Sequence, residues 1–322
     1  MKKNSIAFFA FLALFGILKI FNFSTEKETQ TKITLSPAFD GFTRALEIPQ
    51  NLDFAGEKIP TDLFDVSERL DRELLINTYW QSQTILMFKR AHRWFPVIEP
   101  ILKKNNIPDD FKFLALAESG LLNVISPAGA TGFWQFLSGS AKQYGLVVDF
   151  QIDERYSVEK STEAACKYLQ EAFQTFGSWS LTAASYNMGI EGLKKQLDKQ
   201  RESSYYDLYL NDETSRYLFR LVAFKEVFSH PEKYGFKVSK KYLYPVIPTK
   251  KVEIDSSITS MVDFAEHFGI NYKTLKLFNP WLRQYTLLNK EKLKYRIDIP
   301  DSGFSYLKYL EKMVLEDSLS KE

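Results

Sequence analysis

The stretch from Phe111 to Phe136 constrains the fold more than any other part of this 322-residue chain. An apolar run ends at Glu118, and a Gly- and Pro-rich connection follows it. Asp109 and Asp110 before the run predict a helix N-cap and first turn, and Gly120 predicts a left-handed helix end. The pattern therefore predicts a short apolar helix that delivers one carboxylate to a turn.

That carboxylate belongs to the apolar side of the predicted helix. Residues four and seven positions apart share a helix face, so Glu118 lies on the same face as Leu114 and Phe111. Burial on this face would raise the pKa of the carboxyl group towards neutrality, where it could donate a proton. The alternative is an ordinary Glu at a helix end that turns into water.

Three polar motifs follow in order along the chain. Large rings flank an amide in Phe133-Trp134-Gln135-Phe136, directly after the turn-rich residues 126–132. Ser185-Tyr186-Asn187-Met188-Gly189 comes next, and Glu213-Thr214-Ser215-Arg216-Tyr217 comes last. A buried amide packs poorly and needs hydrogen-bond partners, so the Gln and the Asn of these motifs favour a functional role. For the Phe and the Trp beside the Gln, core packing and the lining of a groove both remain open.

In this order, the Glu-Ser, Gly-x-Trp-Gln-Phe, Tyr-Asn-x-Gly and Glu-Thr-x-x-Tyr motifs resemble those of the lysozyme-like lytic transglycosylases that cleave peptidoglycan (the SLT type, family 1). The chain resembles in particular the membrane-bound D type, in which LysM modules follow the catalytic domain. The resemblance runs from about Phe64 to Pro300. It implies a mainly α fold: a lysozyme-like all-α catalytic domain with N-terminal helices, and a small βααβ module after it.

Composition shifts predict the domain boundaries. We expect a linker over residues 25–60, the catalytic domain with its helical lead-in over residues 61–235, the LysM-like module over residues 245–301 and a helical tail over residues 302–322. No sizeable sheet is expected in the catalytic domain, although residues 122–131 could form a short hairpin.

Helix signals within the catalytic domain are clear. The apolar periodicity predicts helices over residues 81–92 and 96–105, with Pro96 in the first turn of the second one. A further helix over residues 158–176 should end at Gly177, and Ser178 should cap the helix that follows it.

Residues 1–24 have the layout of an export signal. Lys2 and Lys3 precede an uncharged apolar run from Ile6 to Leu18, and a polar stretch comes after it. No good small-x-small cleavage site follows, and extension through Lys19 to Phe23 approaches the length of a bilayer-spanning helix. A cleaved signal peptide and a retained membrane anchor are both open. Either one predicts export to the bacterial cell envelope, in the periplasm, and we favour membrane association through this segment.

The C-terminal module matches a LysM pattern only in part. The usual Gly-Asp-Thr entry is replaced by Asp255-Ser256-Ser257, and the Gly before the last strand is absent. Glycan binding and a packing role are therefore both open for this module. The positions that match are Ser257, Ile258, Ala265, Gly269, Leu275 and Asn279.

The resemblance also implies a mechanism and a set of site residues. Glu118 would act first as acid and then as base, cleaving the β-1,4 bond between N-acetylmuramic acid and N-acetylglucosamine and closing a 1,6-anhydro ring. The muramoyl N-acetyl group would assist at the anomeric carbon. The implied substrate-binding residues are Ser119, Phe133, Trp134, Gln135, Tyr186, Asn187 and Tyr217.

Composition narrows the range of partners. A formal net charge of +2 without a basic run gives no argument for nucleic acid. Cys166 is the single cysteine, and the three histidines are scattered, so we expect no metal site and no cofactor. The expected partners are peptidoglycan glycan strands and the membrane, and the oligomeric state is left open.

Two other functions remain in view. A muramidase of the same fold would use water and need a second acid, with Asp212 or Glu213 about 6.5–9.5 Å from Glu118. A non-catalytic scaffold would only hold the glycan, and it would not need an acid on an apolar face.

Overall fold

The structure is a computed structural model, and it describes residues 43–301 and 304–319. The predicted signal peptide or anchor, residues 1–24, and the first part of the predicted linker lie outside the described residues. The described residues all belong to one compact unit. No helix in the described part of the chain is both long and apolar enough to cross a bilayer.

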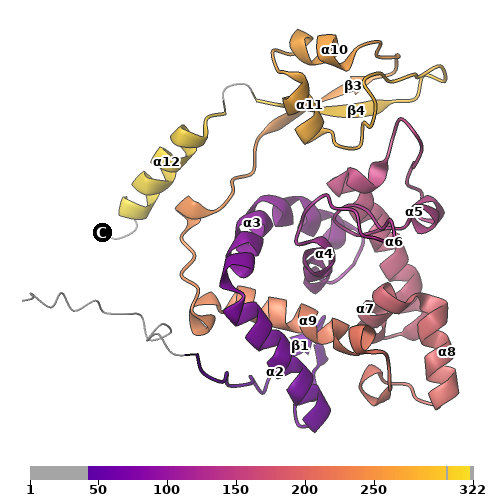
Figure 1. The fold of residues 1–322 in the computed structure, drawn as a ribbon, viewed down its shortest axis with the longest axis vertical. Helices are drawn as coiled ribbons and strands as arrows, with labels where there is room; N and C mark the ends of the chain where they lie inside the picture. Colours follow the sequence, from indigo (N-terminus) through magenta and orange to yellow (C-terminus); the bar gives the residue numbers. More distant parts are fainter. Residues whose placement is uncertain (1–42, 302–303, 320–322) are drawn as a thin grey trace, which may run out of the picture. The chain divides into compact units, whose positions relative to one another are not determined.

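The described residues are mostly helical, as expected from the sequence (Figure 1). Within the described ranges, a pair of two-residue strands comes before the helices, and a longer pair of strands belongs to the C-terminal module. The α-helices are α2 (Phe64–Tyr79), α3 (Gln81–Lys104), α4 (Lys112–Ser119), α5 (Ser138–Gln143), α6 (Val158–Phe176), α7 (Trp179–Met188), α8 (Ile190–Gln200), α9 (Asp212–Ser229), α10 (Met261–His267), α11 (Tyr272–Phe278) and α12 (Tyr306–Leu319).

Helix α4, which carries Glu118, lies in the middle of the helical domain, in contact with α3 and α9 (Figure 1). Leu114 and Phe111 are fully buried, which confirms the predicted apolar face. Gly120 ends the helix in the left-handed conformation with φ +59°, also as predicted. A helix of eight residues is marginal by itself, so its stability comes from this packing.

The predicted Asp N-cap is wrong. Asp109 and Asp110 open a 3₁₀ turn (Asp109–Phe111) before α4, and no side chain caps the helix. The Asp110 carboxylate instead accepts hydrogen bonds from the Ala55 amide at 2.6 Å and from Lys225 Nζ at 2.8 Å. The carboxylate therefore accepts from residues distant in sequence and not from the backbone amides of its own helix.

The division of residues 81–105 into two helices is also wrong. A single helix, α3, continues through Pro96 and Pro100. Each proline removes one i→i−4 hydrogen bond, which costs stability in a helix interior. However, Phe88, Ala91, Ile98 and Leu102 are all buried, at a spacing that keeps one apolar stripe on both sides of Pro96. Tertiary packing of this stripe outweighs the local signal of the prolines.

The predicted linker does not reach residue 60. Strands β1 (Asp53–Phe54) and β2 (Glu57–Lys58) pair into a small antiparallel hairpin. Phe54 and Ile59 are fully buried, and the Phe54 ring packs edge-on against Phe111, with 5.2 Å between centroids. The hairpin is therefore part of the core that holds α4.

The caps of α6 and α7 agree with the sequence. Gly177 ends α6, and the Ser178 side chain accepts a hydrogen bond from the Leu181 amide at the start of α7. The possible hairpin in residues 122–131 is present as an isolated antiparallel bridge between Ile125 and Thr131.

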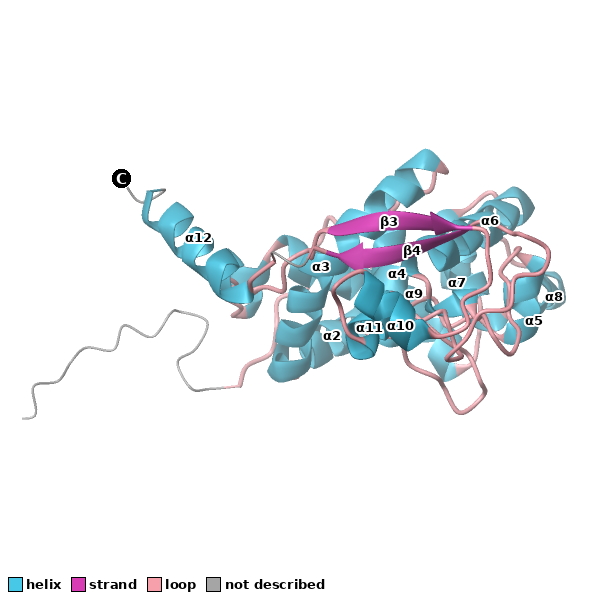
Figure 2. Cartoon of the chain, turned by 90° about the horizontal axis from the view of Figure 1, so that it is seen from above, coloured by secondary structure: helices cyan, strands magenta, loops and turns pink. Residues whose placement is uncertain are grey.

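The C-terminal module has the predicted βααβ order (Figure 2). Strand β3 (Thr249–Ile254) pairs antiparallel with β4 (Tyr295–Pro300), and α10 and α11 lie between them in the chain. Asn279 is fully buried and ties α11 to β4: its amide exchanges hydrogen bonds with the backbone of Asp298, at 2.7 and 2.8 Å. This Asn, which matches the LysM pattern, thus holds the module together.

We expect the substitution Lys276→Met to stabilise the protein. Lys276 on α11 is half-buried, and its ammonium group has no hydrogen-bond partner among the described residues. Burial, with the nearby charge of Arg283, lowers its pKa to about 8. Met keeps the apolar stem and removes the charge, so the free energy of unfolding at pH 7 should rise by roughly 1 kcal/mol, an amount already reduced for solvent screening.

Urea unfolding at two pH values measures this effect. The folded state binds the Lys276 proton less tightly than the unfolded state, so its cost is fully present below pH 8 and fades as the pH rises towards 10.5. The advantage of Met should therefore be smaller at pH 10 than at pH 7. Lys273→Met, at an exposed position of the same helix, is the control. An equal advantage at both pH values would contradict the assignment.

Candidate active site

The site is centred on a contact between α4 and α9. The Tyr217 hydroxyl donates a hydrogen bond to Oε1 of Glu118. Tyr217 is 1% exposed, and Glu118 is partly buried at the end of its helix. The structure thus brings together the acid and the Tyr that the resemblance had placed beside it.

Burial raises the pKa of the Glu118 carboxyl group above its ordinary value. The hydrogen bond from Tyr217 and the positive charge of Arg220 act in the opposite direction, while the negative charge of Glu213 adds to the rise. The desolvation predicted from the sequence is the dominant cause. A carboxyl group in this position can hold a proton near neutrality, and the carboxylate formed when it leaves has two stabilising partners.

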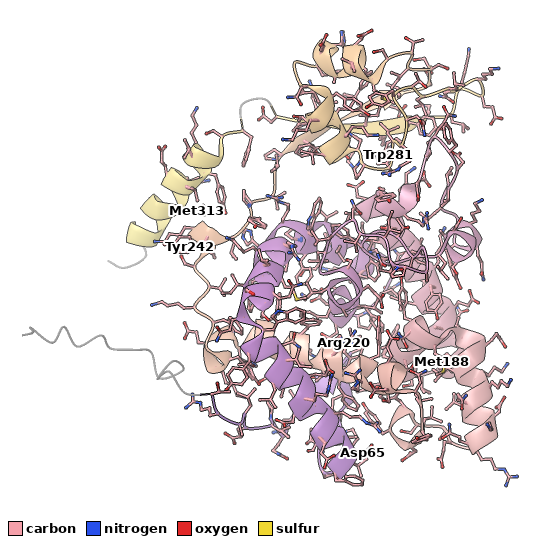
Figure 3. The ribbon with its side chains drawn as sticks, in the orientation of Figure 1. Asp65, Met188, Arg220, Tyr242, Trp281 and Met313 are labelled. Atoms are coloured by element: carbon pink, nitrogen blue, oxygen red, sulfur yellow. The ribbon has the colours of Figure 1, made fainter. Side chains whose placement is uncertain are left out.

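The sequence reasoning missed Arg220, which is labelled on α9 in Figure 3. Arg220 follows Tyr217 by three positions, a spacing that puts both on one helix face, and this spacing was the available signal. Its Nε lies 3.7 Å from Oε2 of Glu73, a residue of α2 that is 2% exposed. Arg216 contacts the same carboxylate at 3.3 Å. Glu73 therefore orients the guanidinium groups of α9 next to the site.

Helix α7 brings Tyr186 and Asn187 to the site. Tyr186 donates a hydrogen bond to the carbonyl of Trp134 at 2.8 Å. Burial and the charge of Glu118 raise the pKa of this hydroxyl well above its usual value, so it stays a neutral donor. The Asn187 Oδ1 accepts a hydrogen bond from Thr214 Oγ1 at 2.6 Å. Among the described residues nothing accepts a hydrogen bond from its Nδ2, which is available to a ligand.

The connection after α4 is tied to that helix by side-chain hydrogen bonds. Ser119 Oγ lies 3.0 Å from the carbonyl of Phe133 and 3.1 Å from that of Ala115. Gln135 has a left-handed backbone with φ +49°, and its Nε2 donates to the carbonyl of Gly132 at 2.7 Å. The amide nitrogen of Gln135 is thus engaged within the connection, and its Oε1 is the atom left for a ligand.

The side chains of Phe133 and Trp134 lie in the core. Trp134 is fully buried, and its Nε1 donates to Thr162 Oγ1 at 2.9 Å. Phe133 packs edge-on against Trp94, with 5.2 Å between ring centroids. Of the two interpretations left open by the sequence, core packing describes these contacts. What the two residues present towards the site are their backbone carbonyl groups, bonded to Ser119 and Tyr186.

Glu57 is a second residue that the sequence reasoning missed. Its carboxylate caps the N-terminus of α7: Oε1 accepts from the Trp179 amide at 2.6 Å, and Oε2 accepts from the amide and the hydroxyl of Ser180, at 2.9 and 2.6 Å. This contact joins residues more than 120 positions apart, so no local pattern announces it. Through it the N-terminal hairpin fixes the helix that carries Tyr186 and Asn187.

Across the described ranges, no group of three or more acidic, His or Cys residues is arranged to hold a metal ion. Cys166 is buried on α6, and its surroundings raise the pKa of the thiol to about 12, so the thiol stays protonated at neutral pH. The groups assembled around the Glu118 carboxyl group are two phenols, amides and a guanidinium group, and Glu213 is near enough for its charge to act on Glu118.

Comparison with known proteins supports the resemblance drawn from the sequence. Residues 95–209 match the Transglycosylase SLT domain, and residues 250–303 match the Soluble lytic transglycosylase C-terminal LysM-like domain. The chain is 27% identical over 228 residues to proteins named Membrane-bound lytic murein transglycosylase D from Escherichia coli strains K12 and O6:H1. The match covers 69% of this chain and 49% of the relatives, so the chain spans about half of their length.

We expect Tyr217→Phe to slow any reaction in which Glu118 transfers a proton, and to shift the pH dependence of its rate. Loss of a hydrogen bond to a charged group costs roughly 1.5–3 kcal/mol, so kcat should fall about 10- to 100-fold. Because that hydrogen bond lowers the pKa of Glu118, its loss should raise this pKa and move the alkaline limb of the kcat profile to higher pH. Tyr209→Phe, at a position 89% exposed, is the control. A shift of the limb to lower pH would refute the assignment.

We expect Glu57→Gln to destabilise the fold and weaken the site through α7. The amide keeps one acceptor oxygen but places an NH₂ group against the donors of the helix end, which should cost about 1–2 kcal/mol in urea unfolding. Glu47→Gln, at an exposed position, should leave the unfolding midpoint unchanged. An unaltered midpoint for Glu57→Gln would show that the cap contributes nothing.

Proposed function

We propose, from the premise that residues 95–209 match a Transglycosylase SLT domain, that this chain is a peptidoglycan lytic transglycosylase. Glu118 would cleave the β-1,4 bond between N-acetylmuramic acid and N-acetylglucosamine. The observation that carries the proposal is the Glu118 carboxyl group, buried at the end of α4 and hydrogen-bonded to Tyr217.

In the first step, protonated Glu118 donates its proton to the glycosidic oxygen as the bond to the muramoyl anomeric carbon breaks. The N-acetylglucosamine side leaves with a hydroxyl group, and the muramoyl N-acetyl oxygen supports the positive charge at the anomeric carbon. The raised pKa of Glu118 supports this role as acid.

In the second step, the Glu118 carboxylate takes the proton of the muramoyl C6 hydroxyl as that oxygen attacks the anomeric carbon. A 1,6-anhydro ring closes, the proton is back on Glu118, and no water is consumed. Tyr217 and Arg220 favour the carboxylate that exists between the two steps. One residue that serves as acid and then as base follows the logic of retaining glycosidases.

The polar groups around Glu118 are suited to hold an amino sugar. Asn187 Nδ2 can donate to an N-acetyl oxygen, and Gln135 Oε1 can accept from a sugar hydroxyl or an N-acetyl NH group. Ser119 and Tyr186 hold the backbone carbonyls of Phe133 and Trp134, the two residues that precede Gln135. We therefore assign sugar binding to the amides and a supporting role to the two buried aromatic residues.

A muramidase is the second candidate, because Glu213 is close enough for its charge to raise the pKa of Glu118. Glu213 is exposed and could act as a base on water. Asp212 is the weaker candidate for this role, since its carboxylate pairs with Arg216 at 2.7 Å. The two reactions give different products, so the product decides between them.

We place the protein in the bacterial cell envelope, in the periplasm, with the membrane contacted through residues 1–24. The name of the relatives, which calls them membrane-bound, supports this placement. Peptidoglycan glycan strands are the proposed substrate and partner.

Mass spectrometry of digested peptidoglycan tests the proposal, with the chain from residue 43 onwards as the enzyme. We expect products that end in 1,6-anhydro-N-acetylmuramic acid, and a loss of at least about 1,000-fold in rate for Glu118→Gln, because the proton donor is removed. Glu213→Gln should keep the anhydro product and most of the rate.

Other outcomes separate the alternatives. Reducing muramic ends that disappear in Glu213→Gln would establish a muramidase. Wall binding without any released product would leave only a scaffold and would overturn the enzymatic proposal.

A further inference from the structure

The LysM-like module is joined to the catalytic domain by a backbone contact. Leu282 forms an antiparallel bridge with Ile152, the Asp153 amide donates to the carbonyl of Trp281 at 2.9 Å, and the Arg283 amide donates to that of Gln151 at 2.8 Å. Trp281 is labelled in Figure 3. Gln284 and Leu288 extend the contact, donating to the Phe150 carbonyl at 3.0 Å and to Gln151 Oε1 at 2.8 Å, so residues 150–153 of the catalytic domain are held by the module segment 281–288.

Side chains close the same contact. Ile152 is 3% exposed and belongs to the apolar cluster of the module, together with Tyr156. The Arg283 guanidinium group lies over the Tyr156 ring at 4.2 Å. The catalytic domain therefore completes the core of the module through these two side chains.

Arg155 lies at the end of the held segment, in the 3₁₀ turn η2 (Glu154–Tyr156). Its guanidinium group forms a two-pronged ion pair with Asp153, with Nε–Oδ1 at 2.9 Å and Nη2–Oδ2 at 2.7 Å. Both side chains of the pair are about one-tenth exposed. Pairing of this kind fixes the plane of the guanidinium group and leaves its other donor pointing in a set direction.

That remaining donor contacts residues 126–136, the segment after α4 that carries Gln135 and that we call the active-site connection. Arg155 Nη1 donates to the carbonyl of Gly129 at 3.1 Å and to that of Phe136 at 3.2 Å. The backbone of Arg155 is also close to Gly132, where a Cβ would lie 2.0 Å from the Arg155 carbonyl oxygen. Gln135 lies between these anchoring points and is bonded to Gly132. Any shift of Arg155 is therefore passed to the turn that presents Gln135.

We propose that Arg155 is a positioning residue for the reaction and that the LysM-like module holds it in place, so that the module acts as a brace of the active-site connection. The inference rests on the proposed function only for its kinetic consequence. Three contacts link the module to the site: the module holds residues 151–153, Asp153 pairs with Arg155, and Arg155 donates to the carbonyls on both sides of Gln135. It assigns the packing role to a module whose LysM pattern is incomplete.

A double-mutant cycle tests the role of Arg155. Arg155→Lys keeps the charge opposite Asp153 but loses the planar fork, and we expect kcat/KM on glycan strands to fall about 10-fold. If the loss acts through Gln135, the same change should cost less than about twofold in a Gln135→Ala background. The alkaline limb of the pH profile should stay in place, because Arg155 does not contact Glu118. Fully additive losses would overturn the positioning role.

Hydrogen exchange, measured on the full 322-residue chain, tests the role of the module. Ile152→Ser removes the side chain that completes the apolar cluster of the module, while Phe150→Ser changes a neighbouring side chain that is 77% exposed. We expect Ile152→Ser to speed exchange at residues 149–156 and also at residues 126–136, and Phe150→Ser to change neither. Unchanged exchange at Leu275 and Ile297 would show that the module itself stays folded.

The two arms fail in different ways. Faster exchange at residues 149–156 without any change at residues 126–136 would overturn the brace, whatever the activity. Absence of product from the unaltered chain would overturn the proposed function and leave the exchange result as an independent measure of the brace.

Discussion

The hydrogen bond between Tyr217 and Glu118 is the interaction on which the site depends. It joins a helix of eight residues, α4, to one of 18, α9. A buried carboxyl group without partners would keep its proton. A solvated carboxyl group would already be ionised near neutrality and would have no proton to donate. Burial has the largest effect on the pKa of Glu118 and raises it, whereas the Tyr217 hydroxyl and the Arg220 guanidinium group stabilise the carboxylate. The same residue can then serve in both halves of a two-step reaction.

Much of the remaining fold serves to keep that contact in register. Glu73 on α2 holds the arginines of α9, and Glu57 on the hairpin caps α7. Lys225 on α9 joins Asp53 of the hairpin to Asp110 before α4, with both distances 2.8 Å. The contacts of Glu73 and Lys225 are partly buried ion pairs, and removal of one partner would leave an uncompensated charge. The N-terminal hairpin, which has the composition of a linker, is thus joined to each of the three helices that carry site residues.

The sequence predicted what local pattern and motif order encode. The apolar face of α4, the left-handed end at Gly120, the cap at Ser178 and the βααβ order of the module all follow from short-range rules. The errors share one cause. In each case, contacts with residues distant in sequence outweigh the local pattern. This holds for the carboxylate of Asp110, the prolines of α3 and the residues around Phe54. Glu57 was invisible for the same reason, whereas Arg220 could have been found from its spacing to Tyr217.

In the LysM-like module, a residue that matches the sequence pattern stabilises the fold of the module itself. Asn279, a residue that matches the LysM pattern, is consumed in tying α11 to β4. The segment after it contributes backbone groups to the catalytic domain, and the catalytic domain returns Ile152 to the apolar cluster of the module. An exchange of this kind resembles a shared core more than two independent surfaces in contact. A module fixed in this way moves with the catalytic domain, so any glycan that it touched would be held at one distance from Glu118.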